Sequence, residues 1–458
     1  MAARTLLTGP ILRWTRHQPD CDAAEMSRLT TSTTAGDERP ASVAIDDLAD
    51  PRFPDHVAEM LRAVEPMAAD LSFSLDAVLA QASTETGLAD FGDDWFREPM
   101  DVVLRSYDTE GGLSAFGRVS VHSQMVGHMR NRLRVEHLVA EHPEILDVAI
   151  AAPIVIIGQP RTGTTHLHNL MAEDPALRSL RYWESLEPVL SDDDQAAVAA
   201  GAPDPRFERC AVGLELLNDA MPLFKRMHEM TVEHVHEEIQ LLAIAGSTML
   251  FETSGVLPSW REWYVGHDQT PAYEYLVRVL QCCQWQRGGD RWVLKSPQHL
   301  EQIPALLNVF PDATFVFTHR DPVSVIASNA TMIAYTARFS AANVDPVKIG
   351  HYWADRIEEM LRAGMRDHAL LPADRTIDVA FDAFMADDLA MVERIYVVAG
   401  QPFTDDARTA MEAFIAAHPR GRHGGVRYDL TGDFSLDAGE LRDRLRDYTD
   451  EFGVTLED

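Results

Sequence analysis

Cysteine is scarce in this chain, with four residues among 458, at positions 21, 210, 282 and 283. Two of them are adjacent and no Cys-x-x-Cys pair occurs, so neither a disulfide framework nor a cysteine zinc site is expected. Long apolar runs are also missing, because the longest, residues 148–158, is 11 residues long and a membrane-spanning helix needs about 20. These absences predict a protein of the reducing cytoplasm with no membrane span.

Positive charge is the other shortage. The chain has 40 Lys and Arg against 72 Asp and Glu, which gives a formal net charge of −32. A surface field of this sign repels nucleic acid polymers and anionic lipid, so neither is expected as a partner. A small anion would need a local concentration of cations, because charges more than about 8 Å away are largely screened at physiological salt. Only three of the cations are lysines, namely Lys225, Lys295 and Lys348.

The hydrophobic fraction of 46% is that of an ordinary globular protein and permits a large core. Residues 1–45 are expected to form a disordered tail, because much of this stretch is polar. Residues 46–147 show apolar spacings of three and four, which predict a helical region. This region is a candidate for a cap over the rest of the chain or for a homo-oligomer surface.

Residues 148–458 alternate short apolar runs with helical patterns, which predicts an α/β domain. The runs that favour strands are residues 153–157, 292–294, 314–317 and 376–379. This repetition predicts a parallel β-sheet flanked by helices, in a P-loop-like α/β fold. Residues 193–287 are interpreted as a helical insertion, and residues 436–452 as a final charged helix.

A glycine-bearing turn, Gly-Gln-Pro-Arg-Thr-Gly-Thr-Thr-His, follows the first predicted strand at residues 158–166. Such a turn directs backbone N–H groups and the positive end of the next helix dipole at an anion. The spacing Gly158-x4-Gly163 is that of a nucleoside-triphosphate P-loop, but Thr164 stands where that motif has its lysine. The turn therefore predicts phosphate binding without γ-phosphoryl transfer. A small-molecule kinase with a degenerate P-loop and a non-catalytic nucleotide-binding protein are the alternatives.

A second anion site is predicted where the strand beginning at residue 314 ends. Arg320 follows this strand, and Ser328 comes eight residues later on the next predicted helix. Both could face one ligand at the carboxyl edge of the sheet, where open α/β folds bind ligands. An Arg fork matches phosphate geometry well. The triplet His-Arg-Asp also occurs in protein kinases, but no kinase glycine loop or Asp-Phe-Gly accompanies it.

Candidate general bases lie in two separate stretches, one of which follows Lys295 at the end of another predicted strand. His299 falls in the first turn of the predicted following helix, where the helix dipole favours the neutral imidazole that a base requires. Glu237 and Glu238 lie in residues 230–240, which are interpreted as a helix followed by an apolar run.

His234 and His236 in the same stretch could ligate a metal. No His-Glu-x-x-His pattern accompanies them, and no metal is expected.

A basic, glycine-bearing stretch at residues 418–428 supplies the local cations that an anionic ligand requires. Its glycines allow a close backbone approach to a ligand. The candidate residues are Arg420, Gly421, Arg422 and Arg427.

Taken together, these motifs resemble those of sulfotransferases that use 3′-phosphoadenosine 5′-phosphosulfate. The match to the family's 5′-phosphosulfate loop comprises Arg161, Thr162, Gly163, Thr164 and Thr165. His166 stands where many members have a Trp that stacks on adenine. Arg320 and Ser328 have the separation of the family's 3′-phosphate pair, and residues 420–422, with Arg427 as an alternative, resemble its closing loop.

The resemblance implies transfer of a sulfuryl group to a hydroxyl of a small-molecule, lipid or carbohydrate acceptor, without a metal. It implies that Lys295 contacts the group being transferred, while His299, Glu237 or Glu238 accepts the hydroxyl proton. Aromatic residues in the insertion, namely Trp260, Trp263, Tyr264 and Tyr275, hint at an apolar or carbohydrate acceptor.

Overall fold

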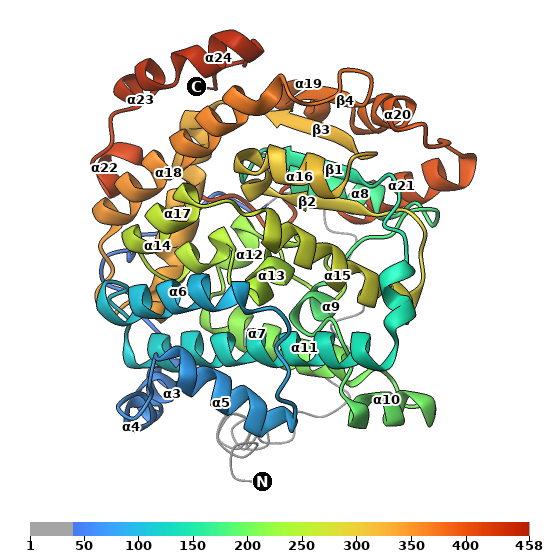
Figure 1. The fold of residues 1–458 in the computed structure, drawn as a ribbon. Helices are drawn as coiled ribbons and strands as arrows, with labels where there is room; N and C mark the ends of the chain where they lie inside the picture. The colour runs from blue at the N-terminus through green and yellow to red at the C-terminus, as the bar shows by residue number, and fades with distance from the viewer. Residues whose placement is uncertain (1–39, 458) are drawn as a thin grey trace, which may run out of the picture.

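The structure is a computed structural model that describes residues 40–457 (Figure 1). Most of the predicted tail, residues 1–39, and Cys21 with it, lie outside the described residues. The β-sheet and its helices occupy one end of the molecule, and the long helix α7 (Ala115–Glu141) crosses the other end. Within residues 40–457, no helix is both long and apolar enough to cross a bilayer.

Four parallel strands form one sheet in the order β2-β1-β3-β4. They are β1 (Ile154–Gly158), β2 (Val293–Ser296), β3 (Thr314–His319) and β4 (Thr376–Ala380). Every residue of β1, β2 and β3 is buried, as expected of parallel strands covered on both faces. The predicted fold class is therefore confirmed, and all four strands lie within two residues of their predicted positions.

Alternate side chains of β1 face two separate apolar cores. Ile154 and Ile156 pack with residues of α8 (Thr164–Met171) and α20 (Asp388–Ala399). Val155 and Ile157 belong to the larger core, which is built with α15 (Thr270–Arg287), α16 (Ile303–Val309), α17 (Pro322–Ser340) and α18 (Pro346–His368). The period of two along a strand produces this division. Because all four strands run parallel, their carboxyl ends lie at one edge of the sheet.

A helical region precedes the sheet and has an apolar cluster of its own. Its helices are α3 (Asp55–Ala63), α4 (Glu65–Ala68), α5 (Leu75–Thr86), α6 (Arg97–Thr109) and α7. Trp260 and Tyr264 of α14 (Pro258–Gly266) are both 0% exposed in this cluster. The interpretation of these two aromatic residues as an acceptor site is therefore wrong, because they are part of the core. The oligomeric state stays a prediction.

The predicted insertion, residues 193–287, is mostly helical, but residues 228–238 around Glu237 and Glu238 are not. Its helices are α10 (Asp192–Ala199), α11 (Pro205–Ala220), α12 (Phe224–Met227), α13 (Ile239–Leu242), α14 and α15. Residues 228–238 form no helix, so the predicted helix over 230–240 is wrong. Instead, Val235 makes an isolated antiparallel bridge with Arg181, and the His236 N–H donates to Leu180 O at 2.8 Å.

Two further helix predictions also need correction. The predicted helix over 436–452 is two helices, α23 (Ala438–Arg444) and α24 (Arg446–Phe452). The predicted helix after Ser296 begins as a 3₁₀ turn, Pro297–Glu301, before α16. The remaining α-helices are α9 (Tyr182–Leu186), α19 (Phe381–Ala386), α21 (Asp405–Ala417) and α22 (Leu430–Phe434).

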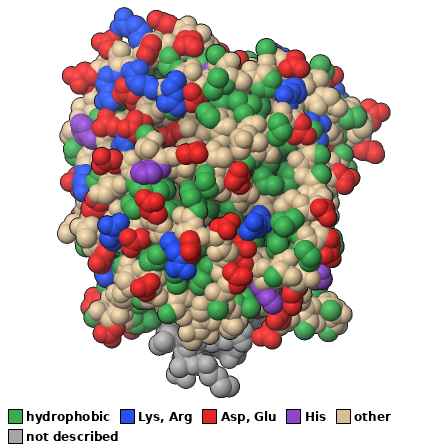
Figure 2. All heavy atoms as spheres, in the orientation of Figure 1, with side chains coloured by type: hydrophobic (Ala, Val, Ile, Leu, Met, Phe, Trp, Pro, Cys, Tyr) green, Lys and Arg blue, Asp and Glu red, His purple; other side chains and the backbone are tan. Residues whose placement is uncertain are grey.

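Lys and Arg side chains lie among Asp and Glu side chains on the face seen in Figure 2. Many arginines of the described residues form ion pairs. Arg209, for example, contacts both Glu187 and Asp194. Exposed pairs of this kind add little to stability. The candidate anion-binding cations Arg161, Lys295 and Arg320 lie at the carboxyl edge of the sheet, after β1, at the end of β2 and after β3.

Candidate active site

The loop between β1 and α8 has the geometry of an anion-binding turn. Arg161 and Gly163 have φ values of 69° and 79°, and α8 begins at Thr164 with no acidic residue in its first turn. The N–H groups at a helix start have no intrahelical acceptor, so this turn offers several donors to a ligand. Gly158 is required by packing, because a Cβ there would collide with the Thr318 hydroxyl of β3.

Thr162 is used inside the loop and presents no hydroxyl to a ligand. It is 2% exposed, its Oγ1 donates to Gln159 O at 2.8 Å, and the same Oγ1 lies 2.9 Å from Thr318 Oγ1. Thr165, by contrast, is half-buried, and its Oγ1 lies 3.5 Å from Lys295 Nζ. Of these two threonines, Thr165 is the one whose hydroxyl lies beside the candidate catalytic lysine.

The structure brings the two predicted phosphate motifs into contact. Arg161 Nε donates to Ser328 Oγ at 2.9 Å, and the Arg320 guanidinium donates to Arg161 O at 2.6 Å. Burial lowers the pKa of Arg161, and the nearby charge of Arg320 lowers it further, while Tyr428 acts in the opposite direction. Two guanidinium groups that repel each other in this way form a site suited to an anion.

Lys295 stands at the meeting point of β2 and the β1–α8 loop. Its side chain is 3% exposed, and its ammonium forms an ion pair with Glu237, whose side chain is 19% exposed. The backbone N–H of Lys295 donates to both carboxylate oxygens of Glu238, at 2.8 and 2.9 Å. The two neighbouring glutamates therefore have different positions, since Glu237 contacts the functional end of Lys295 and Glu238 contacts its backbone.

His299 and Glu238 are both 0% exposed. His299 Nδ1 lies 2.8 Å from the Tyr273 hydroxyl, and its Nε2 lies 3.3 Å from Glu238 Oε2 without making a hydrogen bond. The three side chains form a buried group beneath the end of β2. This geometry suits the positioning of Lys295 better than direct contact with an acceptor.

His166 lies in an aromatic corner beside the loop. Its Nε2 is 2.6 Å from Asp388 Oδ2, and the same oxygen is 2.7 Å from Arg420. The rings of Phe384 and Phe414 have centroids 5.6 and 6.4 Å from the His166 ring. Burial lowers the pKa of His166, while Asp388 opposes that shift.

The 420–427 stretch reaches the site through its arginines, and two of them already have acidic partners. Arg420 binds Asp388 as described, and Arg422 forms an ion pair with Glu229. Gly421 has a φ of 72°, which allows the turn. The Arg427 backbone N–H donates to Val43 O at 2.8 Å.

Sequence patterns did not identify the acidic partners of these cations. Glu229 and Asp388 pair with the basic stretch, and Glu457 pairs with Arg320. These pairs join positions far apart in the chain, such as the 137 residues between Arg320 and Glu457. No local spacing signals such a contact.

A cluster of histidines lies beside Lys295. The two metal-ligand candidates, His234 and His236, are buried, and His228, which the sequence patterns did not single out, is half-buried beside them. The rings of His228 and His234 have centroids 5.3 Å apart, and those of His234 and His236 are 6.0 Å apart. Burial lowers the pKa of His234 to about 4, and Lys295 adds to this effect. Both ring nitrogens of His236 are buried without a hydrogen-bond partner. Within residues 40–457, no set of three or more His, Cys, Asp or Glu side chains is arranged to hold a metal.

The buried histidines make stability depend on pH. The folded protein keeps His234 neutral down to a pKa of about 4, whereas an unfolded chain protonates histidine near pH 6.5. The unfolded state therefore binds more protons between these values, and the free energy of unfolding falls as the pH drops from about 6.5 to 4. Replacing His234 with Gln is expected to remove about 2 kcal/mol of the loss between pH 7 and pH 5.

Urea unfolding at pH 7 and pH 5 measures this difference for each protein. The exposed His351 of α18 provides a matched control, because His351→Gln is expected to leave the difference unchanged. An equal pH dependence in His234→Gln and wild type would contradict the assignment.

Known proteins resemble this chain in sequence and in structure. The model of the sulfotransferase family matches residues 153–405. Sulfotransferase STF1 from Mycobacterium tuberculosis H37Rv is 29% identical with a TM-score of 0.71, and the match covers 81% of this chain and 98% of that one. Sulfotransferase STF9 from Mycobacterium avium is 26% identical with a TM-score of 0.75, covering 85% of this chain and 99% of that one. No curated protein matches the chain.

Proposed function

The chain belongs to the sulfotransferase family, and on that premise we propose that its sulfuryl donor is 3′-phosphoadenosine 5′-phosphosulfate and its acceptor a hydroxyl of a small molecule, lipid or carbohydrate. One observation carries the choice of donor. Arg161, Arg320 and Ser328 converge on one side of the β1–α8 loop, while Thr165 and Lys295 meet on the other. Two polar centres joined by one turn suit a ligand with phosphate groups at both ends.

Different residues bind the two ends of the donor. The amides at the start of α8, Thr165 and Lys295 hold the sulfated end, while Arg320 and Ser328 hold the 3′-phosphate. Arg161 lies between these ends, with its backbone in the loop and its guanidinium on Ser328. The aromatic corner of His166, Phe384 and Phe414 is suited to the adenine.

In the transfer, the acceptor oxygen forms a bond to sulfur as the bond from sulfur to the bridging phosphate oxygen breaks. Lys295 donates a hydrogen bond to that bridging oxygen, which gains negative charge as it leaves. The hydroxyl proton goes to a carboxylate, and the products are a sulfate ester and adenosine 3′,5′-bisphosphate.

Glu237 is the best placed of the three candidate bases. It is the least buried of them, and it contacts the Lys295 ammonium. When Lys295 turns to the bridging oxygen, Glu237 is released to accept a proton, which contributes roughly 10²–10⁴-fold in rate for a positioned base. Glu238 and His299 act as positioning residues through the Lys295 backbone and Tyr273.

Ligand-induced stabilisation distinguishes this proposal from a degenerate P-loop kinase. Adenosine 3′,5′-bisphosphate is expected to stabilise the protein by about 2.7 kcal/mol at 100 times its dissociation constant. ATP with Mg²⁺ at the same concentration is expected to do much less, because the loop has no P-loop lysine. Thermal unfolding with each nucleotide measures the difference, and greater stabilisation by ATP with Mg²⁺ would contradict the proposed donor.

A further inference from the structure

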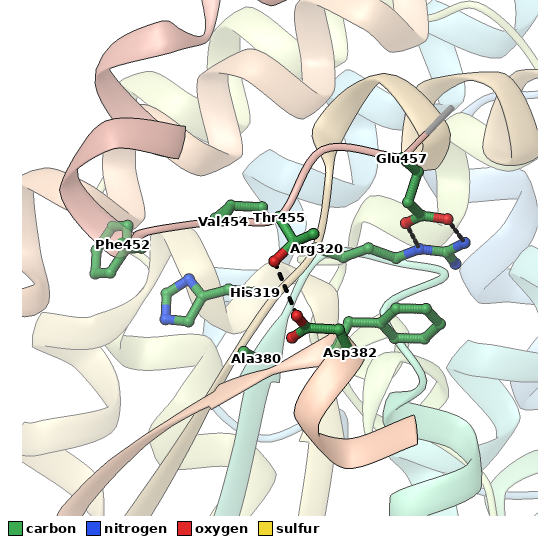
Figure 3. Close-up of a pocket in the computed structure, with 9 residues that line it drawn as sticks. His319, Arg320, Ala380, Asp382, Phe452, Val454, Thr455 and Glu457 are labelled. Atoms are coloured by element: carbon green, nitrogen blue, oxygen red, sulfur yellow. Dashed lines mark hydrogen bonds and ion pairs between the residues drawn. The ribbon is translucent and has the colours of Figure 1, made fainter. Parts of the chain in front are cut away.

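Arg320, assigned above to the 3′-phosphate, is already bound to a carboxylate of the same chain. Its Nε lies 2.6 Å from Glu457 Oε1, and its second nitrogen lies 2.7 Å from Glu457 Oε2 (Figure 3). This paired, planar contact is the geometry in which Arg also binds phosphate. Glu457 therefore takes the donors that a phosphate group would require.

Glu457 belongs to residues 453–457, here called the closing segment, which follows α24. Three polar contacts hold this segment over the end of β3. The Glu457 N–H donates to Asp321 Oδ2 at 2.9 Å, Arg442 donates to Glu457 O at 2.6 Å, and Thr455 Oγ1 donates to Asp382 Oδ2 at 2.8 Å. The closing segment thus lies on Arg320 in a defined conformation.

The space left beside Arg320 is small. The pocket drawn in Figure 3 has a volume of about 40 Å³, and the closing segment forms one of its walls. That volume holds only a few water molecules. The Phe381 ring covers the guanidinium on another side, with its centroid 4.0 Å from Arg320 Cζ. A phosphate group can reach Arg320 only when Glu457 leaves.

Opening the closing segment requires little loss of buried surface. None of residues 453–457 is buried, and Leu456 is 52% exposed. Segments with few buried apolar contacts open at low free energy without unfolding the rest of a protein. The Arg320–Glu457 pair itself is partly exposed, at 21% and 34%, so solvent reaches it.

We propose that the closing segment is an autoinhibitory element in which Glu457 stands in for the 3′-phosphate on Arg320 and is displaced when the nucleotide binds. This inference rests on the proposed function. In the free protein, Glu457 neutralises Arg320 beside Arg161. Since the nucleotide binds only the open form, its apparent affinity is reduced by the fraction of molecules that are open.

The test compares Glu457→Gln with a matched control, Glu440→Gln. Both variants remove one negative charge from the same part of the chain, and Glu440 is exposed in α23. Calorimetric titration with adenosine 3′,5′-bisphosphate is expected to show about three- to tenfold tighter binding to Glu457→Gln than to wild type. Glu440→Gln is expected to bind as wild type does.

Hydrogen exchange gives a second readout on the wild-type protein. The Glu457 amide is hydrogen-bonded to Asp321 in the closed form. Adding the bisphosphate is expected to accelerate exchange over residues 453–457, whereas exchange in α8 should slow.

The outcomes separate the two proposals. Unchanged or weaker binding by Glu457→Gln, with wild type still binding the bisphosphate, would overturn the autoinhibitory role and leave the proposed function in place. Equal gains in both variants would also overturn it, since net charge would then explain them. No binding in any of the three proteins would contradict the proposed function, and the autoinhibitory role with it.

Discussion

Lys295→Met is expected to lower turnover by about 10²–10³-fold, the range observed when one donor to a developing oxyanion is removed. The methionine keeps the apolar stem in its buried place but cannot donate to the bridging oxygen. Affinity for adenosine 3′,5′-bisphosphate should change little, because Arg161, Arg320 and Ser328 remain. The rate of bisphosphate release from 3′-phosphoadenosine 5′-phosphosulfate, with water or an added alcohol as acceptor, measures turnover.

The chain offers a matched control for this substitution among its three lysines. Lys348 is exposed in α18, so Lys348→Met removes the same charge without touching the site and should retain full turnover. Thermal unfolding of both variants shows whether they are folded. A folded Lys295→Met protein with normal turnover would mean that the catalytic assignment is wrong.

The strands were predictable because each carries its signal locally. Residues 153–157 and 314–317 are short runs of buried, mostly β-branched or aromatic residues, and β1 and β3 form there. A strand covered on both faces needs apolar side chains at every position, so a run of consecutive apolar residues is enough to predict it. The turn after β1 was predictable for the same reason, since its glycines and threonines are adjacent in the chain.

The failed helix at residues 230–240 shows where local patterns mislead. Charged residues spaced three and four apart suggest a helical face, and Val232, Val235 and Ile239 supply an apolar stripe with helical spacing. The backbone instead takes its hydrogen bonds from residues 180–182, including a bond from the Tyr182 N–H to His234 O at 2.9 Å. A partner some 50 residues away decided the conformation.

The candidate site also has parts that a local sequence pattern predicts and parts that depend on the tertiary fold. The β1–α8 loop residues, Lys295 and Arg320 could be named from the sequence, because each lies at a strand end. The cations of the 420–427 stretch could be named because they are close together in the chain. Which glutamate contacts the Lys295 ammonium depends on the path of an irregular segment. That Arg320 is held by Glu457 depends on where α24 directs the chain. Both contacts are tertiary, and no spacing within the sequence specifies them.

Arg320→Ala is expected to weaken binding of adenosine 3′,5′-bisphosphate by about 10- to 100-fold, since hydrogen bonds to a charged group contribute roughly 1.5–3 kcal/mol. Binding of adenosine 5′-phosphate, which lacks the 3′-phosphate, should change little. The comparison of two ligands therefore isolates the group that Arg320 holds. Calorimetric titration of both ligands into both proteins measures the selectivity.

Arg446 supplies the control for charge alone. It is 66% exposed at the start of α24, so Arg446→Ala removes one positive charge away from the β3 edge and should bind both ligands as wild type does. Equal weakening of both ligands by Arg320→Ala would assign Arg320 to the general field of the site and not to the 3′-phosphate. Loss of selectivity with retained binding of adenosine 5′-phosphate would instead place the 3′-phosphate at Arg320, on the donors that Glu457 occupies in the free protein.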